Sequence, residues 1–449
     1  MSKKLCDKPV VHSLADSNKV FLNCGQEVKQ MPIDEFRNHL NDNDNQVLND
    51  LAFYIDINTA SSKGSTRVDV GGNDHMRAIW ENSKIPVLMT KNGDYTRLNR
   101  SDCRYTADGE SIVDSTTGQL LSKWANCDVV IIIPEYYGHV QTVTVGATTK
   151  LLPWFSLMPL PNGYIIPQQV VGKFKATLIN GALRSIPGYA PQGSYTINQF
   201  WNYAQARSKN HGLANMDFRN DLLFHMMSKY GWRDSQNCQT VDGTPVWGVG
   251  LDGTENSGGW SAQSGIKMGA TLSLGMSDGK SQITDTAGNT CHKVNVEGFE
   301  DPWGQLWEMV QGICSVGTDV YVWRSNWLPT GTPTAASFSN VDHVVVTRAS
   351  SDGVTLMNIV AEAGGQGVVM IPKQSVSGIS YGDYFWYSAS GQLWLFGGRS
   401  SDGSDCCLAS AYSHFVWSSS YSYFSARLAY YGDVREVSST RLAELAAAA

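Results

Sequence analysis

Charged residues are scarce in this sequence. Asp, Glu, Lys and Arg make up 17% of its 449 residues, against roughly 25% in an average soluble protein, so disorder driven by excess charge is not expected. Acidic residues outnumber basic ones by 41 to 34, and there is no basic run, which argues against nucleic-acid binding. No stretch approaches roughly 18 consecutive apolar residues, so we expect no membrane-spanning helix.

Motifs for the common chemistries are also missing. No apolar stretch follows the charged start, so we expect no secretory signal peptide. The nine cysteines form no C-x-x-C pair, which favours free thiols in a reducing cytosol over disulfides or structural zinc. Residues 248–253 match G-x-G-x-x-G, but a loop-like stretch follows where a dinucleotide site needs a helix. Without a P-loop, G-x-S-x-G or H-E-x-x-H motif, we expect no cofactor, no metal ion and no enzymatic activity.

The sequence is rich in glycine (43) and tryptophan (14), which is typical of a β-rich protein with many turns. We divide it into three parts. Residues 1–45 form an N-terminal attachment or oligomerisation segment, with two short strands within 19–31 and a short helix at 32–40. Residues 46–165 are β-rich and form either a separate unit or part of the main body. Residues 166–440 form the main domain.

Local patterns place the main elements. The β-branched run at 128–133 predicts a buried strand. Apolar residues at helical spacing predict helices over 196–207 and 217–230, the second ending at Gly231. We expect further strands at 320–324, 344–347 and 367–372 and leave the final alanines, 443–449, out of the fold as a low-complexity end.

Glu308 lies among tryptophans in a stretch that begins with Asp301 and Pro302. Proline near the start favours a short helix here. A carboxylate beside Trp303 and Trp307 could act as a general acid with a raised pKa. Because no partner acid or base is visible, we favour a structural role, in which the buried carboxylate pins a loop.

Several segments together resemble a known superfamily. The stretch Phe299-Glu-Asp-Pro-Trp-Gly-Gln-Leu-Trp-Glu-Met resembles the G-N-x-W-E-W segment of C-type-lectin-like proteins of the formylglycine-generating-enzyme branch. Phe396-Gly-Gly-Arg and the later Ser425-Ala-Arg-Leu-Ala resemble the closing strands of that branch. Residues 172–188 and 230–237 are similar to phage tail proteins that use this fold. The resemblance implies an α+β, C-type-lectin-like fold with two helices and short antiparallel strands.

Within that superfamily the closest resemblance is to the variable proteins of diversity-generating retroelements. In these a reverse transcriptase randomises adenines near the 3′ end of the gene, and the fold displays the varied side chains. Residues 400–425 hold ten Ser, six aromatic residues and two Asp, without Lys, Arg or Glu. Randomised AAY codons cannot encode Lys, Glu, Gln, Met or Trp, and of these only Trp417 occurs in the segment.

Serine and tyrosine dominate antibody binding loops, because tyrosine offers a large contact at low entropy cost and serine adapts its hydrogen bonds. We therefore expect a variable binding segment at about 395–430, clamped by regular strands over a frame that includes Trp303, Trp307, Trp386, Trp394 and Phe396. The alternative is a plain serine- and tyrosine-rich strand with alternating faces. The expected ligand contacts are Ser400, Asp402, Asp405, Cys406, Ser410, Tyr412, Ser413, His414, Phe415, Trp417, Ser419, Tyr421 and Tyr423.

The resemblance implies a phage or prophage receptor-binding protein or adhesin. Its expected partners are a bacterial surface protein or glycan and, through residues 1–45, other virion proteins. We expect a homo-oligomer, with a trimer as one candidate, on the phage tail or at the host surface after cytoplasmic synthesis. The alternatives are an oxidase of the formylglycine-generating type and a lectin-like structural tail protein without diversification. The oxidase needs paired cysteines for copper, and neither Cys314 nor the adjacent Cys406 and Cys407 supplies the spacing.

A calcium-dependent sugar lectin is a third option. The family's Glu-Pro-Asn or Gln-Pro-Asp triplet and its Trp-Asn-Asp triplet are both absent from the sequence, so calcium-bridged sugar binding is not supported.

Overall fold

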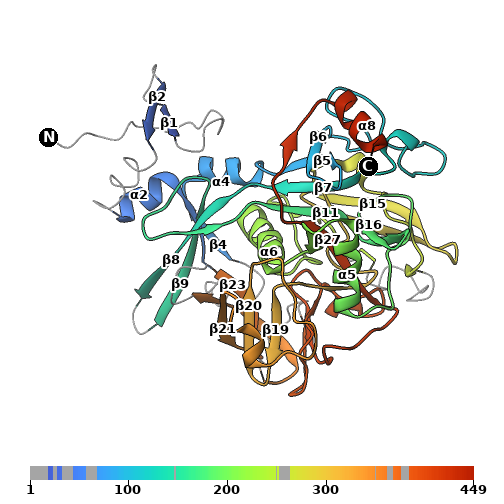
Figure 1. The fold of residues 1–449 in the computed structure, drawn as a ribbon. Helices are drawn as coiled ribbons and strands as arrows, with labels where there is room; N and C mark the ends of the chain where they lie inside the picture. Colours follow the sequence, from blue (N-terminus) through green and yellow to red (C-terminus); the bar gives the residue numbers. More distant parts are fainter. Residues whose placement is uncertain are drawn as a thin grey trace.

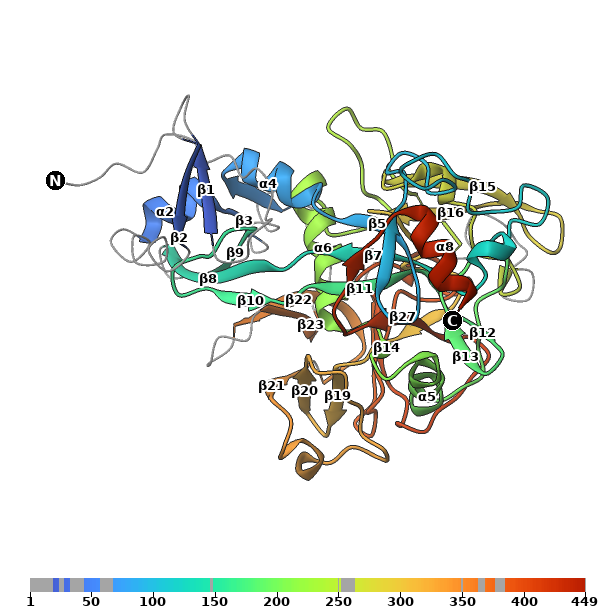
Figure 2. The same ribbon diagram turned by 45° about the horizontal axis from the view of Figure 1, so that its top comes forward.

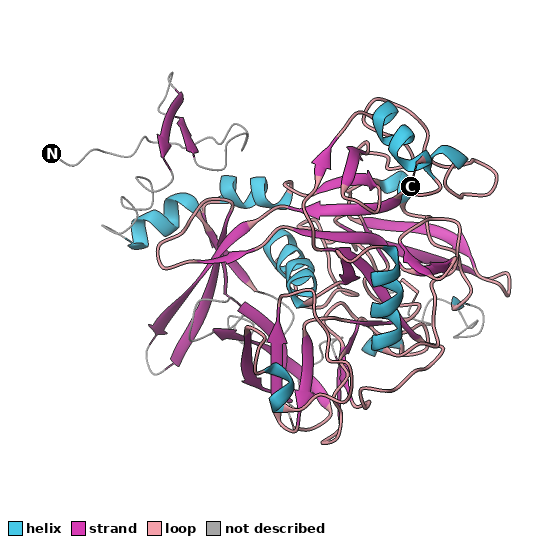
Figure 3. Cartoon of the chain, in the orientation of Figure 1, coloured by secondary structure: helices cyan, strands magenta, loops and turns pink. Residues whose placement is uncertain are grey.

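The computed structural model shows a mixed helix-and-sheet molecule in which most strand pairs are antiparallel (Figures 1 and 3). The structure describes residues 19–23, 28–32, 44–56, 68–145, 148–248, 250–251, 263–348, 350–361, 368–375 and 384–448. The helix expected at 32–40 falls almost wholly outside these residues, as do parts of the G-x-G-x-x-G stretch.

One large sheet organises the molecule. Within the described residues it has 13 strands, in the order β23, β22, β24, β26, β25, β18, β27, β11, β7, β5, β6 and β28, with β14 also paired to β27. Their bounds are β5 Ile85–Met89, β6 Asp94–Arg97, β7 Asp128–Ile133, β11 Gln169–Lys175, β14 His211–Leu213, β18 Trp307–Met309, β22 Gly353–Ala361, β23 Val368–Ser375, β24 Tyr384–Tyr387, β25 Leu395–Phe396, β26 Ala411–Ser413, β27 Phe424–Tyr430 and β28 Arg435–Glu436.

Smaller sheets surround it. The remaining strands are β1 Lys19–Asn23 and β2 Val28–Pro32, which form a hairpin; β10 Tyr164–Ile166, β8 Tyr136–Val145, β9 Thr148–Ser156, β3 Phe53–Asp56 and β4 Asp69–Gly72, in one sheet; β12 Thr177–Ile179 with β13 Ala182–Arg184; β15 Gly279–Thr284, β16 Thr290–Val296 and β17 Phe299–Glu300; and β19 Ile313–Val316, β20 Asp319–Trp323 and β21 His343–Thr347. The β8–β9 hairpin extends away from the body in Figure 1.

The helices are held by the caps that their sequences supply. They are α2 Asp44–Leu51, α4 Asp74–Glu81, α5 Ile197–Arg207, α6 Met216–Tyr230 and α8 Ser439–Ala447, with 3-10 turns η1 Ser122–Trp124, η2 Leu272–Leu274, η3 Ala335–Phe338 and η4 Gly403–Asp405. Thr196 and Gln199 form a capping box on α5. Asn215 caps α6, which ends at Gly231 in the left-handed conformation. Both helices were expected from the sequence and are confirmed.

Helix α6 runs through the middle of the molecule (Figure 1). Residues 216–228 are all buried, including polar side chains such as Asp221 and His225. The spacing of Leu222 and Met226 predicted only an apolar face. The polar face is buried as well because loops that carry charged partners cover it, as described below.

The range 46–165 shares the large sheet with the main domain. Strand β7, predicted as buried, pairs with β5 on one side and with β11 on the other. Strand β11 in turn pairs with β27, so β7, β11 and β27 lie side by side (Figure 2). The hydrogen-bonded ladder therefore runs without interruption from residues before 165 into residues after it.

Two expectations need correction. The stretch that begins at Asp301 forms bends and then strand β18 instead of a helix. Trp307 and Glu308 enter the large sheet beside β25 and β27, and this strand pairing outweighs the local helix signal. Most of the stretch left out as low-complexity is also part of the fold. Residues 443–447 extend α8, whose Leu442 and Ala446 are buried against the cluster around Trp124.

Candidate functional site

The segment expected to bind ligand lies in the half of the large sheet that ends at β23. Strand β24 runs parallel to β26, and Trp386 is the register partner of Tyr412. Alternate residues of a strand face opposite sides. Phe385 and Ala411 are fully buried in the core, so Trp386 and Tyr412 share the other face, where both are half-buried.

The rings on this face form a continuous row, here called the aromatic row. Its members are Tyr384, Trp386, Tyr412, Phe415, Tyr421 and Tyr423. Successive ring centroids are 4.6, 5.2, 4.8, 5.1 and 5.1 Å apart, within the range of favourable ring contacts. Three of these five contacts are stacked, with interplanar angles of 15 to 19°. Tyr421 is 44% exposed and the other rings are half-buried.

Charged side chains border the row at Tyr423. The Arg399 guanidinium lies 4.2 Å from the Tyr423 ring centroid and 3.1 Å from Asp402 Oδ1. Burial raises the pKa of Asp402, and burial together with Asp402 raises the pKa of Asp405. Burial also raises the pKa values of the Tyr412 and Tyr423 phenols. The tyrosines therefore stay neutral and present a ring face and a hydroxyl to a partner.

A rigid base supports the row from below. Trp307, which is 2% exposed, contacts the rings of Trp386 and Tyr412 with centroids 5.4 and 5.5 Å apart. Phe424 is fully buried and contacts Phe415 at 4.9 Å. Close-packed neighbours fix the Trp307 and Phe424 rings, so the row above them is held in place before any ligand arrives.

A buried guanidinium fastens the loops around the row. Arg348 donates hydrogen bonds to the carbonyl oxygens of Ser413 at 3.0 Å, Gly317 at 2.8 Å and Ser388 at 3.0 Å. Its guanidinium also lies 4.8 Å from the Tyr387 ring centroid. These bonds join β26 to two turns that are distant in the sequence.

Glu308 has the structural role expected of it, with a partner that the sequence did not reveal. It is fully buried, and its Oε2 lies 3.1 Å from Nη2 of Arg427, which is also fully buried. Arg427 further donates to the carbonyl oxygens of Gly172 and Lys173. Arg427, Lys175 and Arg219 outweigh burial and lower the pKa of Glu308, so the general-acid hypothesis, which needs a raised pKa, loses its support.

The structure divides the expected ligand contacts into two groups. His414 and Tyr421 are exposed, and Asp402, Asp405, Tyr412, Phe415, Ser419 and Tyr423 are half-exposed. These eight remain predictions. Five others are buried and are corrected here, because a ligand cannot touch them in this structure: Ser400, Cys406, Ser410, Ser413 and Trp417.

Three of the five buried side chains have contacts within the protein that explain their burial. Ser410 Oγ accepts a hydrogen bond from the Cys407 amide at 2.9 Å. The Cys406 thiol donates to the carbonyl oxygen of Gly397 at 3.1 Å. Trp417 fills a core cluster. Serine density in this segment therefore reflects turn-building as well as exposure.

Sequence reasoning also missed part of the surface. Trp386 was assigned to the frame, but it is half-exposed and belongs to the row. Arg399 directly precedes residues 400–425, and Tyr384 lies 16 residues before them; neither was named as a contact. Residues 384–387 are all aromatic, so no alternation in the sequence indicated which of them face outward. The plain-strand alternative holds for β26 (Ala411–Ser413) and from Phe424, where β27 starts.

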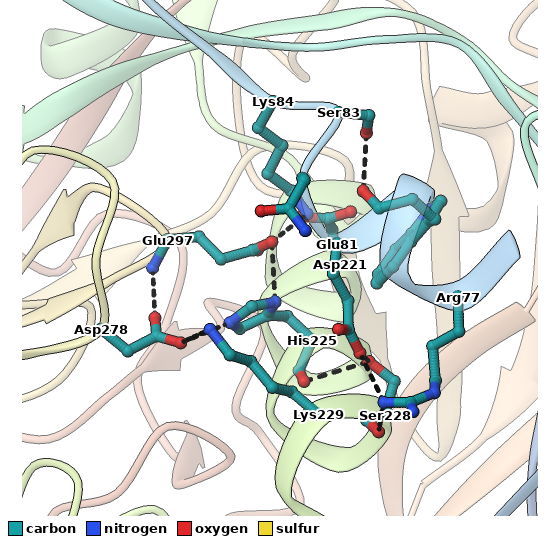
Figure 4. A network of polar contacts seen from close by, with 12 residues as sticks. Arg77, Glu81, Ser83, Lys84, Asp221, His225, Ser228, Lys229, Asp278 and Glu297 are labelled. Carbon is teal, nitrogen blue, oxygen red and sulfur yellow. Dashed lines mark hydrogen bonds and ion pairs between the residues drawn. The ribbon is translucent and has the colours of Figure 1, made fainter. Parts of the chain in front are cut away.

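A second cluster of titratable groups lies deep in the molecule (Figure 4). His225 Nδ1 lies 2.7 Å from Glu297 Oε1, and its Nε2 lies 2.8 Å from Asp278 Oδ2. Lys84 Nζ lies 2.6 Å from Glu297 Oε1 and 3.2 Å from Asp221 Oδ2. These five side chains are at most 3% exposed. They face one another, so we interpret the cluster as a buried tie between α6 and the loops at 278 and 297.

Protonation in this cluster is shifted by burial and by the neighbouring charges. Glu297 and Asp278 outweigh burial and raise the pKa of His225 to about 9. Burial raises the pKa of Asp221 to about 7, although Lys84 opposes the shift. At neutral pH the His225 imidazole is therefore a cation held between two carboxylates.

The oxidase alternative would need two cysteines side by side. The described cysteines are all buried, and Cys314 and Cys406 lie in different core clusters. Burial raises the pKa of the Cys314 thiol, which keeps it protonated and unreactive. Among the residues that the structure describes, no group of three or more His, Cys, Asp or Glu side chains is placed to hold a metal ion.

Comparisons with known proteins do not assign a family. No family model matches the chain, and no curated protein sequence matches it. In the described part of the chain, no helix is both long and apolar enough to cross a bilayer.

Proposed function

We propose that this chain is a ligand-binding protein: a phage or prophage receptor-binding protein or adhesin with a C-type-lectin-like main domain. Its C-terminal segment, about 395–430, would be diversified by a retroelement and would bind varied bacterial surface proteins or glycans. Binding, not catalysis, is its task in this proposal.

The observation that carries the proposal is the aromatic row. Six rings from β24, β26 and the segment between β26 and β27 lie in contact and remain accessible on one face of the large sheet. Tyrosine and tryptophan dominate binding energy at protein interfaces because each buries a large area with few torsions to fix. A rigid row of this kind is suited to recognition.

The frame beneath the row explains how the surface could vary without loss of the fold. The row rests on Trp307 and Phe424, which are buried. A substitution at His414 would change the surface and leave this base untouched, because His414 is exposed and its ring contacts Tyr412 and Phe415. Functional residues placed on a fixed scaffold in this way tolerate replacement.

Replacing Tyr421 with serine is expected to weaken adsorption of the purified protein to host cells by at least about tenfold, since a central interface tyrosine contributes on the order of 2 kcal/mol. The matched control is Tyr105→Ser, because Tyr105 is 39% exposed and belongs to no part of the row. Adsorption would be measured by depletion from solution, and thermal unfolding would confirm that both variants fold. Equal adsorption of both variants would move the binding surface elsewhere.

Diversification has a separate test in the gene. We expect a near-copy of the 3′ end nearby, with adenines where the gene encodes exposed residues such as Tyr412, His414, Tyr421 and Tyr423, and a reverse-transcriptase gene beside it. Codons for buried Trp417 should match between the two copies, because its side chain fills the core. Absence of both the copy and the transcriptase would remove the diversification claim and leave the binding claim standing.

A further inference from the structure

A small cavity of about 50 Å³ lies where the start of β11, the end of β27 and the N-terminus of α6 converge. Val170 and Val171 of β11 line it together with Ala429 and Tyr430 of β27, which are their register partners in the sheet. The aromatic row adjoins the opposite, N-terminal end of β27. The cavity is therefore a separate place in the fold.

Gln169 lines this cavity and is the unexplained group in it. The residue is 8% exposed, and both its amide nitrogen and its amide oxygen are buried without a hydrogen-bond partner among the described residues. A buried polar group left unpaired costs about 1–3 kcal/mol, so such groups need a cause. The torsion next to a terminal amide is soft, and the amide can turn toward the cavity.

Four other polar side chains that line the cavity have partners of their own. Arg324 Nε and Nη2 donate to the Asp217 carboxylate at 2.7 and 3.0 Å. Tyr431 Oη donates to the Leu213 carbonyl at 2.7 Å, and Asn215 Oδ1 accepts from the Phe218 amide at 3.2 Å. The Asp217–Arg324 pair is neutral as a unit, so the cavity carries no net charge that would attract an ion.

We infer that this cavity is a binding site for a small neutral amide, such as an acetamido group. Gln169 presents one donor and one acceptor side by side, and an amide presents the complementary acceptor and donor. A water-sized group takes on the order of 10–15 Å³ of such a cavity, so there is room for about four heavy atoms, the number in acetamide. The methyl group of the ligand then packs against Val171 and Ala429.

Acetamide itself is the decisive probe. Titration of the full chain, followed by the methyl resonances of Val170 and Val171, should give saturable shifts with acetamide. Acetone, which has the same shape but no N–H donor, and acetate, which carries a charge, should give none. N-acetylglucosamine and Nε-acetyl-lysine then distinguish a sugar source of the group from a peptide source, according to which one binds more tightly than acetamide.

The variant Gln169→Leu removes both polar atoms at nearly constant volume. We expect it to keep or raise the thermal midpoint, because the amide has no internal partner, and to weaken acetamide binding by at least about tenfold. Tyr421→Ser should leave acetamide binding unchanged, so this inference and the proposed function fail independently. Equal shifts with acetone, unchanged binding in Gln169→Leu, or a crystal from acetamide solution in which the cavity holds only water would each overturn the inference.

Discussion

Replacing Glu308 with glutamine is expected to lower the free energy of unfolding by about 3–5 kcal/mol. The substitution removes the negative charge from a fully buried ion pair and leaves the Arg427 guanidinium without its carboxylate. Breaking one side of a buried pair is costly because the remaining charge stays in a medium that cannot solvate it. Lys175 and Arg219 also act on Glu308, so three buried cations would lose the same counter-charge.

The measurement is urea unfolding of the wild-type protein and the variant. The matched control is the same change at Glu444, whose carboxylate lies 2.7 Å from Arg441 in a pair whose side chains are more than half exposed. That control should change the free energy of unfolding by less than about 1 kcal/mol. A double replacement, Glu308→Leu with Arg427→Met, should recover part of the loss. A cost for Glu308→Gln no larger than that of the control would show that the pair does not hold the sheet together.

A second large effect is expected from pH. His225 has a pKa of about 9 in the folded protein and about 6.5 in the unfolded chain. Because folding raises this pKa, the stabilisation is complete below pH 6.5 and is lost as pH rises through 9. The shift corresponds to about 3 kcal/mol. His225→Gln should therefore be less stable than the wild type by about that amount at pH 6, and the two stabilities should converge near pH 9.

Among the neighbouring groups, Asp221 titrates within this range, and the charge of His225 lowers its pKa. Asp278 has a lowered pKa, so its contribution is lost only on acidification. Asp221, with a pKa of about 7, costs stability as it ionises between pH 4 and 7. Asp221 and Glu297 outweigh burial and raise the pKa of Lys84, which therefore stays charged from pH 6 to 9. His414→Gln is the control, since His414 is exposed. A stability difference that stays constant from pH 6 to 9 would contradict the charged state assigned to His225.

Elements with strong local signals were predictable from the sequence. The apolar spacing of α5, the stop at Gly231 and the β-branched run of β7 each act over a few residues, and each element appears where expected. The strands around 321, 345 and 370 follow the same logic. In all of these elements, the conformation that the local sequence favours is also the one that the packing of the fold requires.

Features that depend on distant partners were not predictable. Arg427 lies 119 residues from Glu308, and no local pattern connects them. Partners that are distant in the sequence also explain the strand around Trp307, because this segment pairs with β25 and β27. The polar face of α6 is buried for the same reason: Asp278, just before β15, and Glu297, just after β16, cover His225.

The composition of residues 400–425 indicated roughly where the aromatic row lies. It did not indicate which side chains belong to the row. Serine and tyrosine counts cannot separate Ser413, which is buried, from Tyr412, which is half-exposed, because that depends on the strand face. Tyr384 and Trp386 join from β24, which pairs with β26 in space. A residue's exposure is thus set by register, which one sequence without its pairing does not contain.

The position of β27 has a consequence for synthesis. This strand pairs with β11, β14 and β18 near the middle of the large sheet, yet it is synthesised after all three of them. A nascent chain on the ribosome therefore carries β11 and β18 with unsatisfied edges until β27 has been made. Such late-closing, long-range topologies fold slowly and are prone to associate while incomplete. If the segment is diversified as we propose, every variant has to complete this step before it can bind, so folding yield selects among the variants as well as recognition.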